Sequence, residues 1–173
     1  MPGTDNSLME AKVLLRLEHL PKGNLVVLDA FGGFGAVWRE VAARSGREVV
    51  RVGIDKEDRP GCLKGDNRKW LKGMDLSHFT VIDLDAYGVP FDQVAILKRK
   101  GYKGHVFFTF ITVGMGCVPV KLIGNRDAWK ACPTIWGQIG WRLWLDYLGS
   151  LGIKRVWHRS EFRKHYGYFV LTG

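Results

Sequence analysis

The stretch that decides the fold is NLVVLDAFGGFGAV, residues 24–37. Its apolar run ends in Asp29, and a helical pattern begins near Ala36. A strand, a glycine turn and a helix in this order open a nucleotide-type α/β site, in which an acid at the strand end can hold a polar or cationic part of the ligand. Glycine suits the turn because a ligand can approach where a Cβ would clash. The candidate turn residues are Phe31, Gly32, Gly33 and Gly35.

The spacing of these glycines narrows the kind of ligand. A dinucleotide site requires G-x-G-x-x-G, but counting from Gly33 the third position is Trp38. A P-loop requires a Lys-Ser or Lys-Thr pair after the glycines, and none follows here. The remaining pattern is D-x-F-G-G-x-G, and a purely structural turn stays open as the alternative.

Composition and charge bound the possible partners. The chain has 173 residues, which we interpret as one domain, 1–173, with an N-terminal packing helix in 1–21 and a core in 24–173. The net charge of +9 favours an anionic partner, most simply nucleic acid, although a generally basic protein is the alternative. Three cysteines form no C-x-x-C pair, so no zinc site or disulfide framework is indicated, and we expect a cytosolic protein without a metal.

A second strand, EVVRVGI, ends at Asp55, twenty residues after Gly35. An acid at this position of a βαβ unit can accept hydrogen bonds from ribose hydroxyls, with a solvated loop acid as the alternative. Farther along, Asp66 and Asn67 have the donors and acceptors to bind a purine edge. Alternatively, Asp66 caps the short helix predicted over 68–72, and both roles are compatible.

The second strong signal is the strand FTVI, residues 79–82, which continues into DLDAYGVP. Two carboxylates, Asp83 and Asp85, and the ring of Tyr87 therefore follow the end of a strand that we expect near the centre of the sheet. This is the edge at which open α/β sheets bind ligands.

Both motifs resemble those of a known family. The D-x-F-G-G-x-G turn resembles motif I of class I S-adenosylmethionine-dependent methyltransferases, with Phe31 at the first glycine position. DLDAYGVPF, residues 83–91, resembles the D-x-D-P-F-G-S-P motif IV of the tRNA guanine-N2 dimethyltransferase family. The resemblance spans residues 24–112. Ala86 replaces that family's proline, and its large tRNA-recognising C-terminal region has no room here.

The resemblance implies a Rossmann-like α/β fold, with a seven-stranded, mostly parallel sheet that ends in an antiparallel hairpin. It implies S-adenosylmethionine as the cofactor and Asp85 as the carboxylate that orients an exocyclic amine, with Tyr87 stacked on the base. Asp83 would support the methionine amino group or the loop, with a buried structural carboxylate as the alternative. The implied cofactor-binding residues are Asp29, Phe31, Gly32, Gly33, Gly35, Asp55, Asp66, Asn67 and Asp83.

The C-terminal half supplies candidate contacts to a nucleic acid substrate. Two strands, expected from Gly152 and from Tyr166 onward, are too close in sequence to be parallel, and in the implied fold their loop lies on the ligand side. A solvated hairpin tip is the alternative. The expected contacts are Arg159, Phe162, Arg163 and Lys164 in this hairpin and Lys121 and Arg126 in the long loop 113–128.

These observations predict methylation of an exocyclic base nitrogen in nucleic acid, and the resemblance favours guanine N2 of RNA. A DNA base amino group and a catalytically inactive cofactor- or nucleic-acid-binding module remain alternatives. Because the recognition region of the family is missing, a separate recognition partner is possible.

Overall fold

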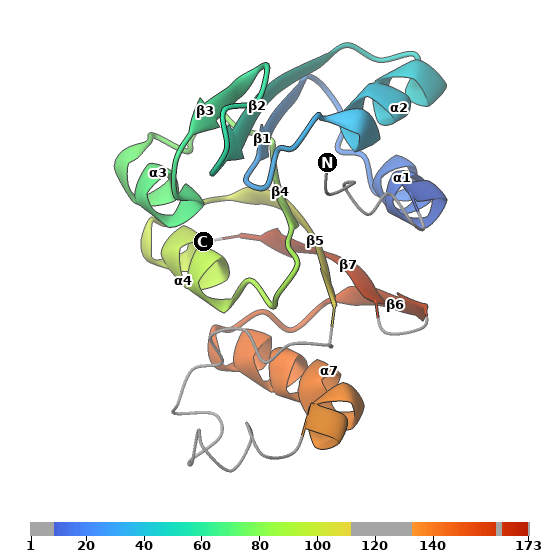
Figure 1. Cartoon of the computed structure of the whole chain (residues 1–173), viewed down its shortest axis with the longest axis vertical. Helices are drawn as coiled ribbons and strands as arrows, with labels where there is room; N and C mark the ends of the chain where they lie inside the picture. The colour runs from blue at the N-terminus through green and yellow to red at the C-terminus, as the bar shows by residue number, and fades with distance from the viewer. Residues whose placement is uncertain (1–8, 112–132, 162–163, 173) are drawn as a thin grey trace.

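The computed structural model describes residues 9–111, 133–161 and 164–172, which form one seven-stranded sheet in the order β3-β2-β1-β4-β5-β7-β6 (Figure 1). Strands β3, β2, β1, β4 and β5 are parallel, whereas β7 is antiparallel to both β5 and β6. This confirms the predicted sheet and its terminal hairpin. The strands are β1 Leu25–Asp29, β2 Val49–Asp55, β3 Cys62–Lys64, β4 Val81–Asp85, β5 Gly104–Ile111, β6 Trp157–Glu161 and β7 Lys164–Leu171.

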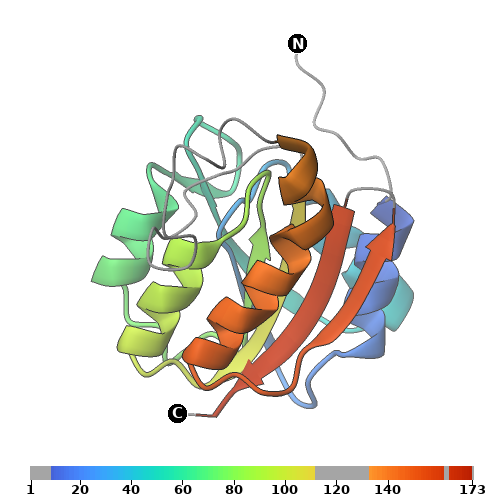
Figure 2. The same cartoon turned by 90° about the horizontal axis from the view of Figure 1, so that it is seen from below.

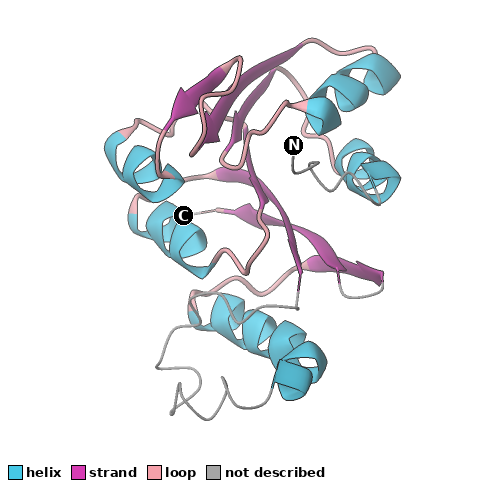
Figure 3. Cartoon of the chain, viewed as in Figure 1, coloured by secondary structure: helices cyan, strands magenta, loops and turns pink. Residues whose placement is uncertain are grey.

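The two central strands bring the two motifs together. β1 and β4 pair in parallel with Asp29 opposite Asp83, so their carboxyl ends lie side by side. Both strands are buried along nearly their whole length, because helices cover both faces of the sheet. The glycine turn and the acidic loop therefore leave the sheet at adjacent points (Figure 3).

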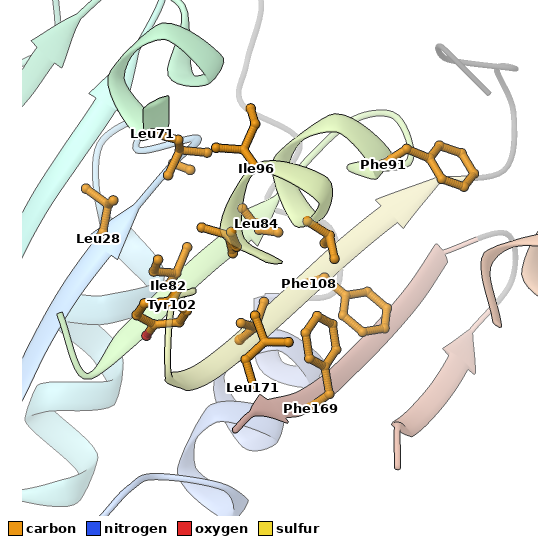
Figure 4. Packing of buried hydrophobic residues seen from close by; sticks show 14 of the residues in the cluster. Leu28, Leu71, Ile82, Leu84, Phe91, Ile96, Tyr102, Phe108, Phe169 and Leu171 are labelled. Atoms are coloured by element: carbon orange, nitrogen blue, oxygen red, sulfur yellow. The ribbon is translucent and has the colours of Figure 1, made fainter. Parts of the chain in front are cut away.

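Helices form a layer on each side of the sheet (Figure 2). On one face, α1 and α2 pack over a core that contains Val13, Val27 and Trp38. On the other face, α3, α4 and α7 cover a larger core that contains Ile82 and Phe108 (Figure 4). The helices are α1 Met9–Glu18, α2 Ala36–Ser45, α3 Asn67–Gly73, α4 Phe91–Arg99 and α7 Pro133–Ser150.

Two helices bury a face that simple apolar spacing would not single out. On α1, Leu14 is 44% exposed and the charged Arg16 is buried. The buried face of α7 is centred on Trp144 and Leu148, and Tyr147 packs beside it. The burial of Arg16 is explained by its ion pair with Asp83 on β4, in the middle of the sheet.

The sixth strand also begins later than predicted. β6 starts at Trp157, not at Gly152, and pairs with β7 only from Trp157 to Glu161. Residues 152–156 precede the strand as a connection from α7. No helix in the described ranges is long and apolar enough to cross a membrane.

Candidate active site

A cavity of about 280 Å³ opens at the carboxyl ends of β1, β4 and β5. Asp29 and the glycine turn line one side of it, and the acidic loop after β4 lines the other. Its volume is near the lower end of the range for small-ligand cavities. The predicted site residues that line it are Asp29, Phe31, Gly32, Gly33, Gly35, Asp83, Asp85, Tyr87 and Lys164.

The glycines of the turn make room for an arginine of the protein itself. A Cβ on Gly32 would lie 2.7 Å from Arg51 Nη2, and one on Gly35 would lie 2.8 Å from the Arg51 guanidinium carbon. Gly35 also has a φ of +67°, which disfavours other residues. The sequence interpretation attributed these glycines to ligand approach. In the structure, a Cβ on Gly32 or Gly35 would crowd the Arg51 side chain, and one on Gly32 would also crowd Cys62, whereas a Cβ on Gly33 would meet little. The role of these glycines in ligand approach stays a prediction.

Arg51 holds Asp29 beneath this turn. Its Nε donates a 3.0 Å hydrogen bond to Asp29 Oδ2, and its Nη2 donates to the Gly32 carbonyl. Burial, with the nearby charge of Asp83, raises the pKa of Asp29 to about 6, although Arg51 acts in the opposite direction. Asp29 therefore titrates near neutral pH while lining the cavity.

Asp83 is almost fully saturated by donors from α1 and α2. Arg16 donates to both of its carboxylate oxygens, at 2.7 Å and 2.6 Å, and Trp38 Nε1 donates at 2.6 Å. Arg16 is completely buried, so this is a buried bidentate ion pair. These contacts fit the alternative in which Asp83 is a buried structural carboxylate. The ion pair also anchors α1 to the central strand β4.

Asp85 is more exposed than Asp83 and is paired with Lys12, another residue of α1. Lys12 Nζ lies 2.7 Å from Asp85 Oδ2, and the two side chains are 13% and 21% exposed. Both residues line the cavity, whose rim includes the 71% exposed ring of Tyr87. The helix interpreted as a packing element therefore also contributes a cation to the candidate site.

Ala86 stands where the motif that this loop resembles has a proline, and its backbone amide makes a hydrogen bond in the structure. Its N–H donates a 2.9 Å hydrogen bond to the Thr109 carbonyl on β5, a bond that proline cannot make. The acidic loop is thus tied to the neighbouring strand by its backbone.

The residues predicted on the ribose and adenine side lie outside the cavity lining and are engaged locally. Asp55 accepts hydrogen bonds from the Gly33 amide at 3.0 Å and the Glu57 amide at 2.9 Å. Asp66 caps α3 through the Arg68 amide, which confirms the capping role, and its side-chain bonds with Arg68 lower its pKa to about 2. Asn67 Nδ2 donates to the Ala30 carbonyl at 2.8 Å.

Two of the basic residues predicted to contact nucleic acid lie in the described strands of the hairpin. Lys164, the first residue of β7, pairs with Ile111 at the carboxyl end of β5 and lines the cavity. Arg159 lies on β6 opposite Tyr166. Phe162, Arg163, Lys121 and Arg126 lie outside the described residues.

Sequence reasoning missed Lys12, Arg16 and Arg51. A signal for the first two exists, because Lys12 and Arg16 are four apart on a helix and Asp83 and Asp85 are two apart on a strand. Both pairs lie on one side of their element. Among the described residues, no cluster of three His, Cys, Asp or Glu side chains could hold a metal ion.

Comparisons with known proteins identify the fold. No family model matches the chain, and no curated protein matches its sequence. Among solved structures, it is similar to a Methanococcus maripaludis protein assigned as an S-adenosylmethionine-dependent methyltransferase (TM-score 0.56, 12% identity, 97% of this chain and 89% of that one). The chain is also similar to a Listeria monocytogenes protein assigned as a class I S-adenosylmethionine-dependent methyltransferase. That match has a TM-score of 0.52 and 14% sequence identity, and it covers 98% of this chain and 60% of that one.

A third similar structure is the plantazolicin methyltransferase BamL with bound SAH (TM-score 0.52, 9% identity, 95% of this chain and 84% of that one). The chain spans about three fifths of the length of the Listeria protein. At these identities the likeness shows the fold: the chain has the class I methyltransferase fold.

Proposed function

We propose that this chain transfers a methyl group from S-adenosylmethionine to an exocyclic base nitrogen of nucleic acid, with guanine N2 of RNA as the favoured acceptor. The observation that carries the proposal is that the glycine turn, Asp85 and Tyr87 line one cavity at the tips of β1 and β4. In an open α/β sheet this crevice is the usual ligand site.

The cofactor would lie across the ends of β1 and β2. Asp29 would face the methionine ammonium in the cavity, with Phe31, Gly32, Gly33 and Gly35 around it and Asp83 fixed behind. Asp55 would accept hydrogen bonds from ribose hydroxyls, and Asp66 and Asn67 would border the adenine. Asp55 already fixes the Gly33 amide, so ribose binding and the shape of the turn are coupled.

The chain's own contribution to the reaction is to align the acceptor. An exocyclic amine is a poor nucleophile because its lone pair is delocalised into the ring, and positioning supplies much of the rate. Hydrogen bonds from its N–H groups to Asp85 and to the carbonyl of Ala86 or Tyr87 would turn the lone pair toward the methyl group. S-adenosylmethionine, when bound, would supply the electrophilic methyl group and keep the sulfur as the leaving group. Asp85 would accept the proton that the amine nitrogen loses on methylation and pass it to solvent.

Exposure and charge favour a nucleic acid acceptor. The Tyr87 ring is 71% exposed at the cavity rim, where it can stack on an extruded base, and Lys164 lies on the same rim. The net charge of +9 adds attraction to phosphates. The further proposed contacts are Arg159, Phe162, Arg163, Lys121 and Arg126, and a separate recognition partner remains part of the proposal.

The test is transfer of tritium from labelled S-adenosylmethionine to tRNA, to DNA or to neither, with Asp85→Asn as the matched control. We expect label in tRNA that the Asp85→Asn protein fails to transfer, and N2-methylguanosine after digestion. Label in DNA alone would move the proposal to a DNA base amino group. Cofactor binding without transfer to any nucleic acid, by folded protein, would overturn the proposed acceptor class.

A further inference from the structure

A second basic surface lies at the opposite end of the sheet from the cavity. β7 runs from Lys164, at the cavity, to Leu171, but β6 pairs with it only between Lys164 and Tyr168. Beyond that point the connection 152–156 diverges, and an open groove of about 860 Å³ lies beside the last residues of β7. Tyr168, the first β7 residue that lines the groove, is four residues from Lys164, which corresponds to about 13 Å at about 3.3 Å per residue.

The lining of this groove is cationic. It contains Lys98 from α4 and the exposed Lys154 and Arg155 from the connection, and none of the described residues that line it is Asp or Glu. Glu18 approaches His19, a lining residue, at 3.9 Å but does not line the groove itself. Three cations without an acid among them give the groove a positive potential that attracts anions.

Aromatic rings in fixed positions complete the groove. The His19 ring stacks on Tyr168 with centroids 4.5 Å apart, and its edge meets Trp157 at 5.3 Å. The Tyr168 hydroxyl lies 2.6 Å from His105 Nδ1, which fixes the ring. All three lining rings are half-buried, so part of each is accessible. Cations beside partly exposed rings are the combination that binds single-stranded nucleic acid, through phosphates and base stacking.

We infer that this groove, which we call the distal groove, is a second contact for a nucleic acid strand, and that it extends the substrate footprint away from the cavity. The inference rests on the proposed function for the identity of the strand. At about 3.4 Å per nucleotide of a helical strand, the separation of about 13 Å corresponds to about four nucleotides. The distal groove would thus add contacts to the strand beyond those at the cavity.

The test measures binding of a fluorescent 20-nucleotide single-stranded RNA by anisotropy across a range of salt concentrations. The groove variant is Lys154→Gln with Arg155→Gln. The matched control is Lys69→Gln with Lys72→Gln, which removes the same charge from exposed positions on α3. Near-ultraviolet circular dichroism checks that both variants are folded.

We expect the groove variant to bind the RNA severalfold more weakly than wild type. The slope of the logarithm of its binding constant against the logarithm of salt concentration should be shallower by about 1.4, for two lost phosphate contacts. The control variant should match wild type in both. Equal binding by the two variants would overturn the distal groove and leave the proposed function standing. Absence of salt-dependent binding to RNA or DNA by the wild-type chain would overturn both.

Discussion

At the scale of single residues, the pairing of Lys12 with Asp85 makes α1 part of the candidate site. The two side chains are 73 positions apart in sequence and meet at 2.7 Å on the cavity wall. Lys12 is bonded to Asp85 Oδ2, so under the proposed function it would fix the orientation in which the carboxylate faces the acceptor. Lys12 is therefore a positioning residue in this account.

Replacing Lys12 with Met should lower kcat for methyl transfer by roughly ten- to a hundredfold, on the scale of leaving a partly buried charged group without its partner. Cofactor affinity should change little, because the substitution leaves the glycine turn intact. Steady-state kinetics and calorimetric titration with S-adenosylhomocysteine separate the two effects. Lys12→Arg should recover part of kcat, and an unchanged kcat in Lys12→Met would remove Lys12 from the mechanism.

The raised pKa of Asp29 predicts a pH-dependent stability. Its folded pKa of about 6 lies above its ordinary value of 3.8, so its contribution to stability is present below pH 3.8 and is lost as the pH rises through 6. Asp29→Asn lacks this titration. The free energy of unfolding of Asp29→Asn minus that of wild type should therefore rise between pH 4 and pH 7, by up to about 3 kcal/mol.

Urea denaturation at pH 4, 5, 6 and 7 measures this difference, and Asp146→Asn, at an exposed position, controls for the loss of one charge. A difference that stays flat for Asp29→Asn across this range would show that Asp29 is not perturbed by burial.

At the scale of elements, the glycine turn and the acidic loop are held by protein groups that are specific to this chain. Arg51 fills the space beside Gly32 and Gly35, and the Ala86 amide is bonded to β5. Both loops are therefore shaped before any ligand arrives, which lowers the entropic cost of binding.

A double-mutant cycle tests the packing of Arg51 against the turn. Gly35→Ala should destabilise the wild-type chain by the strain of a positive φ, about 1–2 kcal/mol, plus a clash with the guanidinium. In an Arg51→Ala background the clash is absent, so the cost should fall by about 1 kcal/mol or more. Chemical denaturation of the four proteins gives the coupling, and additive effects would mean that Arg51 does not fill this space.

Introducing proline at position 86, as in the motif that this loop resembles, should lower the free energy of unfolding. Ala86→Pro removes the N–H that donates to the Thr109 carbonyl, and we expect a loss of roughly 1–3 kcal/mol in the free energy of unfolding. Ala86→Ser, which keeps the N–H, is the control for a change at this position. Equal stability of the proline variant and wild type in thermal unfolding would contradict the importance of this bond.

The elements that could be predicted are those with local signals. Apolar runs that lead into Asp29 and Asp83 predicted the central strands, and the glycine turn before Ala36 predicted the start of α2, which the structure confirms. Arg16 could not be predicted as buried, because its partner Asp83 is 67 residues away. The start of β6 could not be predicted either, since Ile153 and Val156 extend the apolar pattern although the chain joins the sheet only at Trp157.

At the scale of the whole molecule, the sheet carries a cavity at the carboxyl ends of its parallel strands and the distal groove at the other end of β7. α1 connects the two, because Lys12 lines the cavity and His19, just past its last turn, lines the groove. The candidate site depends in turn on side chains from both halves of the chain, from Lys12 on α1 to Lys164 on β7.

The most direct test of the central claim is a crystal structure of the chain with S-adenosylhomocysteine. We predict the ribose hydroxyls at Asp55, the methionine moiety in the cavity beside Asp29, and the sulfur directed at the loop that holds Asp85 and Tyr87. A nucleoside bound elsewhere, or a cavity closed to the compound at saturating concentration, would contradict the account.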